Sequence, residues 1–298
     1  MHELDRLRLA LADAAARGEP VLLATVLGVE GSTYRGAGAR MVVRADGTRV
    51  GAVSGGCLEA DIAARAADLL AARASDVVHY DTRDPGNDLL GLGLGCQGVL
   101  DVRLESLDGA PLARAIAELA ELRERTAVRL LVCGGGTDAI PLVRLAALVG
   151  WLPTVVDHRP SFATAERFSD AERVLLVNAA EDPGALGGAL ALDRFAAAVV
   201  MAHSAAHDRA CLHALLGIPS LRFLGVLGPR RRTLELLEGT GVTADGLPPH
   251  LHAPVGLDLG AETPEEIALA IVSECAAVLA GREPRSLRDR EGPIHEGR

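Results

Sequence analysis

The turn that carries Cys57 has the residue types best suited to chemistry in this chain. Cys57 lies in GAVSGGCLEAD, residues 51–61, directly after Ser54 and two glycines. Because Gly55 and Gly56 lack Cβ atoms, their backbone can adopt positive φ and present N–H groups to a ligand. Cys57 would open a helix, whose dipole stabilises a thiolate. The segment fits a ligand site, and it also fits a strand–turn–helix connection with a small buried thiol.

A second glycine-flanked cysteine strengthens the ligand interpretation. Cys96 follows Gly95 in the segment GLGLGCQG. One cysteine in a glycine-rich loop is usually structural, but two in matching settings favour a joint role. Glu59, in the first turn expected after Cys57, would either satisfy the helix dipole or face a ligand. No histidine or other base is placed in sequence to activate Cys57 as a nucleophile.

Arginines are gathered in two other segments. The loop GSTYRGAGAR ends at Arg40 and also contains Arg35. Two guanidinium groups beside glycine amides can bind a phosphate, although loop arginines are more often solvated charge. Arg230, Arg231 and Arg232 open an expected helix, which is the unfavourable end for cations. This misfit suggests a nearby anion or partner carboxylate, against the alternative of simple surface charge.

The segment after residue 127 carries a dinucleotide-binding pattern. An apolar strand at residues 128–133 precedes GGGTDA, a helix follows, and the next strand ends at Asp157. This order matches G-x-G-x-x-G/A with an acidic residue roughly 20 positions on. Gly134 would make the tight turn, Gly136 would let the backbone approach a phosphate, and Asp157 would accept a hydrogen bond from a ribose hydroxyl. Many such folds have lost or exchanged their nucleotide.

Two polar residues follow a later strand of the same alternating pattern. His203 and Asp208 come just past an expected strand at residues 198–201. Open α/β sheets bind ligands beyond the carboxyl ends of their strands, so both are candidate ligand contacts. His207 lies beside them in sequence, but the helical spacing predicts that it points elsewhere. A histidine at a strand end is as often a structural hydrogen-bonding residue.

The elements that position these residues fall into two groups. The sequence predicts an N-terminal α+β domain at 1–125 and a Rossmann-like domain with a mostly parallel sheet at 126–282, so the fold class is α/β. Residues 283–298 are charged and rich in proline and glycine, and we expect a mobile tail. Thr263, Pro264 and Glu266 form a capping-box pattern that we assign to stability. The other expected elements are helices at 2–17, 57–74, 110–125 and 207–216, and strands at 21–29, 41–44, 49–53, 76–81, 99–105, 154–156, 174–177 and 221–226.

Composition excludes several classes of protein. The 298 residues carry a formal net charge of −10, which argues against a general nucleic-acid binder. The five cysteines are odd in number and widely spaced, which disfavours disulfides and a structural zinc site. No signal peptide and no apolar run of about 18 residues is present, so no membrane span is expected. We expect a cytoplasmic protein.

Seven segments, in this order, resemble the XdhC/CoxI family of accessory proteins of molybdenum hydroxylases. The resemblance covers about residues 20–282 and departs from the commonest pattern at Tyr34, Ala202 and Pro229. The matching segments are GSTYRGAGARMVV, GAVSGGCLEADI, GLGLGCQGVLDV, GGGTDAIPLVRLAALVGWLPTVVDHRP, MAHSAAHD, GVLGPRRRT and HAPVGLDLGAETPEEIALAI.

The resemblance implies a chaperone-like protein with no turnover of its own. Such a protein binds the molybdenum cofactor (molybdopterin), protects it while a cysteine desulfurase makes its sulfurated form, and inserts it into an apo molybdenum hydroxylase client. A homodimer is expected. With this resemblance, Cys57 and Cys96 are expected to approach the molybdenum or its sulfido ligand. The expected cofactor-binding residues are Arg40, Ser54, Gly55, Gly56, Cys57, Glu59, Gly95, Cys96, Gly134, Gly136, Asp157, His203, Asp208 and Arg230.

Two alternatives remain open from the residues. The first is an NAD(P)-dependent oxidoreductase that uses Gly134, Gly136 and Asp157 for its dinucleotide, although His203 alone is a thin basis for hydride-transfer chemistry. The second is a division of roles, in which the C-terminal domain binds a nucleotide or a cytidylylated cofactor while the N-terminal domain holds the pterin.

Overall fold

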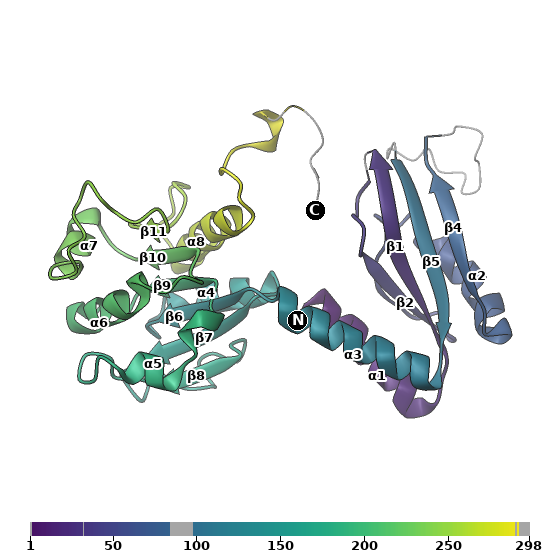
Figure 1. Cartoon of the computed structure of the whole chain (residues 1–298), viewed down its shortest axis with the longest axis horizontal. Helices are drawn as coiled ribbons and strands as arrows, with labels where there is room; N and C mark the ends of the chain where they lie inside the picture. Colours follow the sequence, from purple (N-terminus) through teal and green to yellow (C-terminus); the bar gives the residue numbers. More distant parts are fainter. Residues whose placement is uncertain (1, 32, 84–97, 290, 292–298) are drawn as a thin grey trace. The chain divides into compact units, whose positions relative to one another are not determined.

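The chain divides between Thr126 and Ala127 into two units, each of which has its own sheet (Figure 1). The computed structural model describes residues 2–31, 33–83, 98–289 and 291. The N-terminal unit comprises Glu3–Thr126, and the C-terminal unit comprises Ala127–Ser286.

The N-terminal unit is built on a five-stranded antiparallel sheet with the order β3-β2-β1-β5-β4. Its strands are β1 (Val21–Gly31), β2 (Arg40–Arg44), β3 (Arg49–Gly51), β4 (Ser75–Asp81) and β5 (Gly98–Leu107). Its helices are α1 (Glu3–Arg17), α2 (Glu59–Ala72) and α3 (Gly109–Thr126).

Both faces of this sheet are covered by helices. Successive residues of a strand point to opposite faces. Leu22 of β1 and Met41 of β2 accordingly pack with Ile62 of α2 in one core cluster. Leu23 and Val42 belong to a second cluster with leucines of α1 and α3. Figure 1 shows α1 and α3 running side by side. Along β1, β2 and β5, alternate residues therefore pack against α2 on one face and against α1 and α3 on the other.

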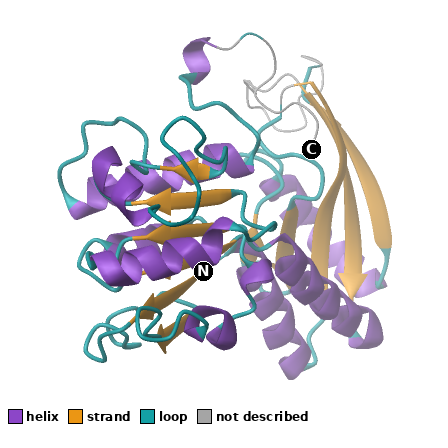
Figure 2. Ribbon diagram, turned by 60° about the vertical axis from the view of Figure 1, so that its left-hand side comes forward, coloured by secondary structure: helices purple, strands orange, loops and turns teal. Residues whose placement is uncertain are grey.

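The C-terminal unit is a six-stranded parallel sheet with helices on both faces (Figure 2). One face packs on α5, α6 and α7, and the other packs on α4 and α8. The strands are β6 (Arg129–Cys133), β7 (Leu152–Asp157), β8 (Arg173–Leu176), β9 (Ala197–Val200), β10 (Phe223–Val226) and β11 (Leu251–His252). The helices are α4 (Ala139–Leu148), α5 (Ala185–Ala189), α6 (Ala205–Leu216), α7 (Arg230–Leu236) and α8 (Pro264–Leu279), with short 3-10 turns at Leu192–Arg194 and Leu287–Asp289.

The strand order places the topological switch point of the sheet between β6 and β9. The order β8-β7-β6-β9-β10-β11 is the doubly wound arrangement in which connections run in opposite directions from β6 and β9. Ligands of such sheets bind beyond the carboxyl ends of these two strands. The predicted α/β class, with a Rossmann-like parallel sheet after an α+β domain, is confirmed.

Two local predictions can be compared with the structure in detail. The helix expected from residue 57 begins at Glu59, so Cys57 lies just before the helix and not in its first turn. The capping box at Thr263 is confirmed, because its side chain accepts a hydrogen bond from the N–H of Glu266 and the Glu266 carboxylate accepts one from the N–H of Thr263.

Candidate functional site

Glu59 organises the turn that carries Cys57. Its buried carboxylate accepts hydrogen bonds from the N–H of Val53 at 3.1 Å, from the N–H of Ser54 at 2.8 Å and from the Ser54 hydroxyl at 2.5 Å. Burial alone would raise the pKa of this carboxyl, but the hydrogen bonds from Ser54 and Val53 outweigh it and the pKa is lowered. Glu59 is therefore ionised and occupied by its own turn, and it does not present a free oxygen to a ligand.

Ser54 links the Glu59 carboxylate to the Cys57 thiol through hydrogen bonds. While donating to Glu59, its Oγ accepts hydrogen bonds from the N–H of Gly56 and the N–H of Leu58, each at 3.2 Å, and from the thiol of Cys57 at 3.4 Å. The thiol is partly exposed, in contrast to Cys133, Cys211 and Cys275, which are buried. The buried Glu59 carboxylate thus holds Ser54, and Ser54 holds the partly exposed sulfur of Cys57.

The two glycines keep this turn open. Gly56 has φ of +116°, and a Cβ atom added there would meet no atom within 4 Å, so its outer side faces open space. At Gly55 a Cβ would lie 3.5 Å from the ring of Tyr34, an aromatic side chain with 67% of its surface exposed. The structure brings together Ser54, Gly55, Gly56, Cys57 and Glu59 as expected, and it adds Tyr34, which the sequence pattern did not place at this turn.

Arg40 lies away from this turn. It pairs in register with Thr25 at the start of β2, and its side chain lines a cavity with Leu23 beneath α3. Cys57 packs with the cluster on the α2 face of the same sheet. The structure therefore separates Arg40 from Cys57 by the sheet itself and corrects the expectation that both join one site. Strand alternation is the physical reason, since Met41 on the α2 face forces Arg40 to the other.

Two other expected contributions to this region have different outcomes. Arg35 forms an ion pair with Glu3 at 2.6 Å, so its guanidinium group is already engaged. Gly95 and Cys96 lie outside the described residues, and their role stays a prediction from the sequence.

In the C-terminal unit, close packing requires glycine at the turn after β6. Gly134 has φ of +127°, and a Cβ there would lie 2.5 Å from the carbonyl carbon of Met201 and from the nitrogen of Ala202. The turns after β6 and β9 thus touch backbone to backbone. Gly136 faces the His203 ring, which would lie 3.6 Å from an added Cβ.

Asp157 is bound within the chain and has no side-chain surface exposed. Its Oδ2 accepts from the N–H of Gly135 at 2.7 Å and from Arg159 Nη2 at 2.8 Å, while its Oδ1 accepts from the N–H and Nε of Arg159. Burial would raise the pKa of this carboxyl, but the bonds from Arg159 and Gly135 lower it to about 2. The predicted ribose contact is therefore not supported, because no oxygen of Asp157 faces outward.

Arg159 and Arg167 complete this arrangement, and the sequence pattern identified neither. The guanidinium of Arg159 also stacks on the Phe162 ring at 3.7 Å. Arg167 donates from Nε to the carbonyl of Gly135 at 2.9 Å. Gly135 is thus held at its N–H by Asp157 and at its carbonyl by Arg167. The only sequence signal was the acid–arginine pair two residues apart after a strand.

His203 and Asp208 have separate roles despite their nearness in sequence. Asp208 is fully buried, accepts from the N–H of Ala202 at 2.8 Å, and forms an ion pair with Arg232. His203 is 58% exposed, has φ of +57°, and contacts Asp138 Oδ2 through Nε2 at 3.2 Å. His203 with Asp138 therefore lies exposed beyond the carboxyl ends of β6 and β9, whereas Asp208 holds the β9 turn in place.

His207 stacks on His158 with ring centroids 3.5 Å apart, beside the end of β7. Burial, with a smaller contribution from His158, lowers the pKa of His207. This side chain is neutral near pH 7 and serves packing around the Asp157 turn.

The three arginines at the start of α7 find partners inside the chain. Arg230 donates to the carbonyl of Ala244 at 3.2 Å, Arg231 pairs with Glu235 at 3.5 Å, and Arg232 bonds the carbonyl of Leu227 as well as Asp208. Their unfavourable position at the helix start is thus compensated internally and does not require an external anion.

The part of the chain that the structure describes holds no group of three or more His, Cys, Asp or Glu residues arranged to bind a metal ion. Within the same residues, no helix is long and apolar enough to cross a membrane.

Comparison with known proteins matches both units. The family described as the XdhC Rossmann domain matches residues 130–275, and the XdhC and CoxI family matches residues 14–81. The chain belongs to the XdhC/CoxI family.

Several members resemble this XdhC/CoxI chain over most of its length. A Bacillus subtilis protein, named as a probable subunit of xanthine dehydrogenase, is 29% identical and covers 86% of this chain and 92% of itself. The molybdenum cofactor insertion chaperone PaoD of Escherichia coli is 25% identical over 92% of this chain and 88% of its own. A crystal structure from Bacillus halodurans, described as a xanthine dehydrogenase, has a TM-score of 0.81 at 29% identity and covers 95% of this chain and 97% of its own.

Proposed function

We propose that this chain binds the molybdenum cofactor at the turn of residues 54–57 and delivers it to an apo molybdenum hydroxylase. The observation that carries the proposal is the partly exposed Cys57 thiol beside two glycines. Ser54 accepts a hydrogen bond from this thiol and is itself held by ionised Glu59. The name of PaoD, a molybdenum cofactor insertion chaperone, supports the same role.

The residues of the turn fit such a group. Thiolate sulfur is a soft ligand of the kind that soft metal–sulfur centres accept. The open space outside Gly56 leaves room for a bulky ligand beside the sulfur. When bound, the cofactor supplies the molybdenum and sulfur chemistry that the client enzyme uses. The chain's own residues position the sulfur through Ser54 and cover one side of the turn with Tyr34.

We also propose how the cofactor is sulfurated, in what form the chain acts, and which second thiol takes part. The cofactor is sulfurated by a cysteine desulfurase while it is bound, the chain acts as a homodimer in the cytoplasm, and Cys96 joins Cys57 at the cofactor. The names of the relatives, which refer to xanthine dehydrogenase and to cofactor insertion, support a client of the molybdenum hydroxylase class.

The test measures cofactor retention. Wild type and variants are purified from cells that make the cofactor, and bound molybdenum and pterin are measured by metal analysis and by fluorescence of the oxidised pterin. Cys57→Ala should lose most of the bound cofactor, and Cys96→Ala should lose part of it. Cys275→Ala, which removes a buried thiol of the other unit, should retain the wild-type amount. Full retention in Cys57→Ala and Cys96→Ala, with unchanged client activation, would refute the proposal.

A second function, nucleotide binding by the C-terminal unit, is favoured by the switch point between β6 and β9, where open α/β sheets bind ligands. Gly136 and the exposed His203 lie next to each other at this switch point. A ligand there would be a nucleotide or a cytidylylated cofactor. An NAD(P)-dependent oxidoreductase is less well supported, since Asp157 offers no ribose acceptor. Titration calorimetry with CTP and with NADH separates these cases, and tight NADH binding without pterin would reverse the ranking.

A further inference from the structure

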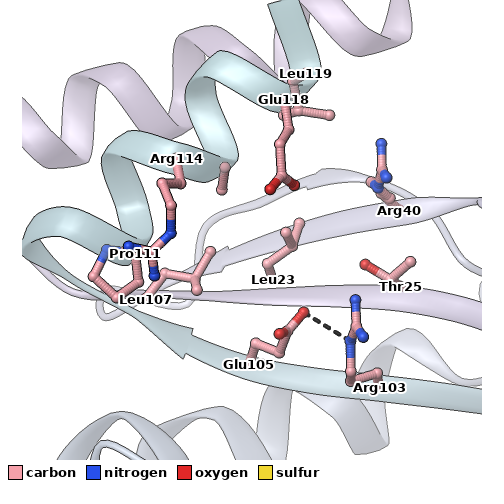
Figure 3. A pocket seen from close by; sticks show the side chains of 11 residues that line it. Leu23, Thr25, Arg40, Arg103, Glu105, Leu107, Pro111, Arg114, Glu118 and Leu119 are labelled. Carbon is pink, nitrogen blue, oxygen red and sulfur yellow. Dashed lines mark hydrogen bonds and ion pairs between the residues drawn. The ribbon is translucent and has the colours of Figure 1, made fainter. Parts of the chain in front are cut away.

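A cavity of about 280 Å³ lies in the N-terminal unit between α3 and the face of the sheet opposite Cys57 (Figure 3). Strands β1, β2 and β5 form its floor and α3 forms its roof. Leu23, Leu107 and Leu119 provide an apolar part. The rest of the lining is charged, and Arg103, Arg114 and Glu118 are exposed where the cavity opens to solvent.

The sheet register places two arginines on either side of Thr25. Thr25 of β1 pairs with Arg40 of β2 and, on its other edge, with Arg103 of β5. Because paired residues of neighbouring strands project to the same face, both guanidinium groups point into the cavity, as Figure 3 shows. Arg114 reaches the same space from α3. Arg40 and Arg114 lie at opposite ends of the cavity, with Glu118 between them (Figure 3).

The cavity is lined by three arginines and two glutamates, so one positive charge is in excess. Arg103 forms an ion pair with Glu105 at 2.9 Å. Arg40 Nη1 is buried and has no hydrogen-bond partner among the described residues. Within the same part of the chain, Arg114 forms no ion pair, and the Glu118 carboxylate points into the cavity (Figure 3). Buried polar groups in proteins are normally hydrogen-bonded, so an unpaired guanidinium nitrogen beside a cavity marks a place for an acceptor.

We propose that this cavity binds a small organic anion, a carboxylate or a phosphate monoester. Arg40, whose buried Nη1 has no partner among the described residues, holds the anionic oxygens, because a guanidinium group matches the geometry of both acceptors. Arg114 adds positive charge at the other end of the cavity. The leucines contact the carbon part of the ligand, and Glu118 accepts a hydrogen bond from a hydroxyl or amino group. The volume of about 280 Å³ lies just below the usual range for ligand pockets, roughly 300–1,000 Å³, so the ligand has the size of a small metabolite.

This site is independent of the cofactor site proposed above. Arg40 faces α3, whereas the Cys57 turn packs with the α2 face. A ligand in the cavity therefore touches neither the thiol nor the turn that holds it, and loss of one site leaves the other intact.

The experiment titrates the full chain calorimetrically with glycerol 3-phosphate, with lactate and with uncharged glycerol. One of the two anions should bind with a stoichiometry near one, and glycerol should not bind. Arg40→Gln should weaken binding of that anion by roughly tenfold or more, since it removes a charge-assisted hydrogen bond. Arg114→Gln should weaken it by roughly two- to threefold, since it removes a nearby positive charge that is exposed to solvent. Arg125→Gln is the matched control, because Arg125 lies on the same helix, is exposed, and does not line the cavity.

Cofactor retention is measured on the same variants. Arg40→Gln should retain the wild-type amount of cofactor, whichever amount Cys57→Ala retains. The inference is overturned if neither anion binds, if Arg125→Gln weakens binding as much as Arg40→Gln does, or if Arg40→Gln loses cofactor while anion binding persists. Should Arg40→Gln not fold, Arg114→Gln decides, because its side chain projects from α3 and forms no part of the sheet.

Discussion

The backbone N–H of Gly135 donates a 2.7 Å hydrogen bond to the carboxylate of Asp157, which lies 22 residues later in the chain. This bond joins the turn after β6 to the end of β7, and Arg159 closes over the same carboxylate. The acidic residue that follows the second strand is thus used to fix the glycine-rich turn. The ordered turn, and not the acid itself, is therefore what the C-terminal unit presents beyond the carboxyl end of β6.

Asp157 should make the stability of the C-terminal unit depend on acid pH. Its pKa is lowered to about 2 in the folded chain, from an ordinary value of about 4. A lowered folded-state pKa contributes stability that is complete above the unfolded pKa and is lost as pH falls through the folded pKa. We expect Asp157 to contribute about 2 kcal/mol near neutral pH, and this contribution should disappear between about pH 5 and pH 2.

The measurement is urea unfolding followed by tryptophan fluorescence. Trp151 is the only tryptophan of the chain and lies in the C-terminal unit, so it reports this unit alone. Asp157→Asn should be less stable than wild type at pH 7, and the difference should shrink as the pH approaches 2. Asp193→Asn, at an exposed carboxylate of the same unit, is the control. A constant difference across this pH range would contradict the role of the Asp157 charge.

Gly134→Ala should strongly destabilise the C-terminal unit. A Cβ atom would meet backbone atoms of the β9 turn at 2.5 Å, and φ of +127° is already unfavourable for alanine. We expect a loss of about 2 kcal/mol or more in the free energy of unfolding, measured by Trp151 fluorescence. Gly188→Ala is the matched control, because a Cβ there meets nothing within 4 Å. Equal stability of the two variants would show that the β6 and β9 turns do not touch.

The elements of this fold were predictable from sequence because hydrophobic periodicity is local. The alternating strands and helices after residue 127, and the capping box at Thr263, follow from patterns of a few residues. The hydrogen-bond partner of each polar side chain was not predictable in this way. Asp157 has the spacing of a ribose acceptor, yet Arg159, two residues on, occupies both of its oxygens. Which group a carboxylate meets depends on the turn geometry that those contacts themselves create.

In the N-terminal unit, the surroundings of Arg40 and Glu59 were likewise not predictable from the sequence. Residues 41–43 of β2 are all apolar, so alternation along the strand is hidden and the face of Arg40 cannot be read from the sequence. The register with Thr25 and the helix layers settle it. Glu59 was expected to face either the helix dipole or a ligand, and its reach back to Ser54 depends on the tight turn between them.

Thr263→Ala should lower the stability of the C-terminal unit modestly. The variant loses the side-chain half of the capping box at the start of α8, which typically costs about 1 kcal/mol. Trp151 packs against the core cluster that includes Ile271 of α8, so its fluorescence reports the change. Thr243→Ala, at an exposed threonine in a loop, should be neutral. A loss in Thr263→Ala no larger than in this control would show that the cap does not stabilise α8.

Cys57 should react with alkylating agents before the buried cysteines do. Its thiol is partly exposed, whereas Cys133, Cys211 and Cys275 are buried. Burial raises the pKa of Cys275 to about 12, so this group stays protonated and unreactive. Treating the native chain with iodoacetamide near neutral pH, followed by peptide mass spectrometry, should show Cys57 modified roughly tenfold or more faster than these three.

Ser54→Ala tests whether the hydrogen bond to Ser54 restrains this thiol. Ser54 Oγ accepts a hydrogen bond from the Cys57 thiol at 3.4 Å and so holds the sulfur against the turn. The variant should therefore alkylate faster at Cys57, while the rate at Cys275 stays constant. Ser75→Ala, at an exposed serine of the same unit, is the control and should match wild type. An unchanged rate at Cys57 in Ser54→Ala would mean that the serine orders only the backbone of the turn, and that the sulfur is held by its packing against the α2 face.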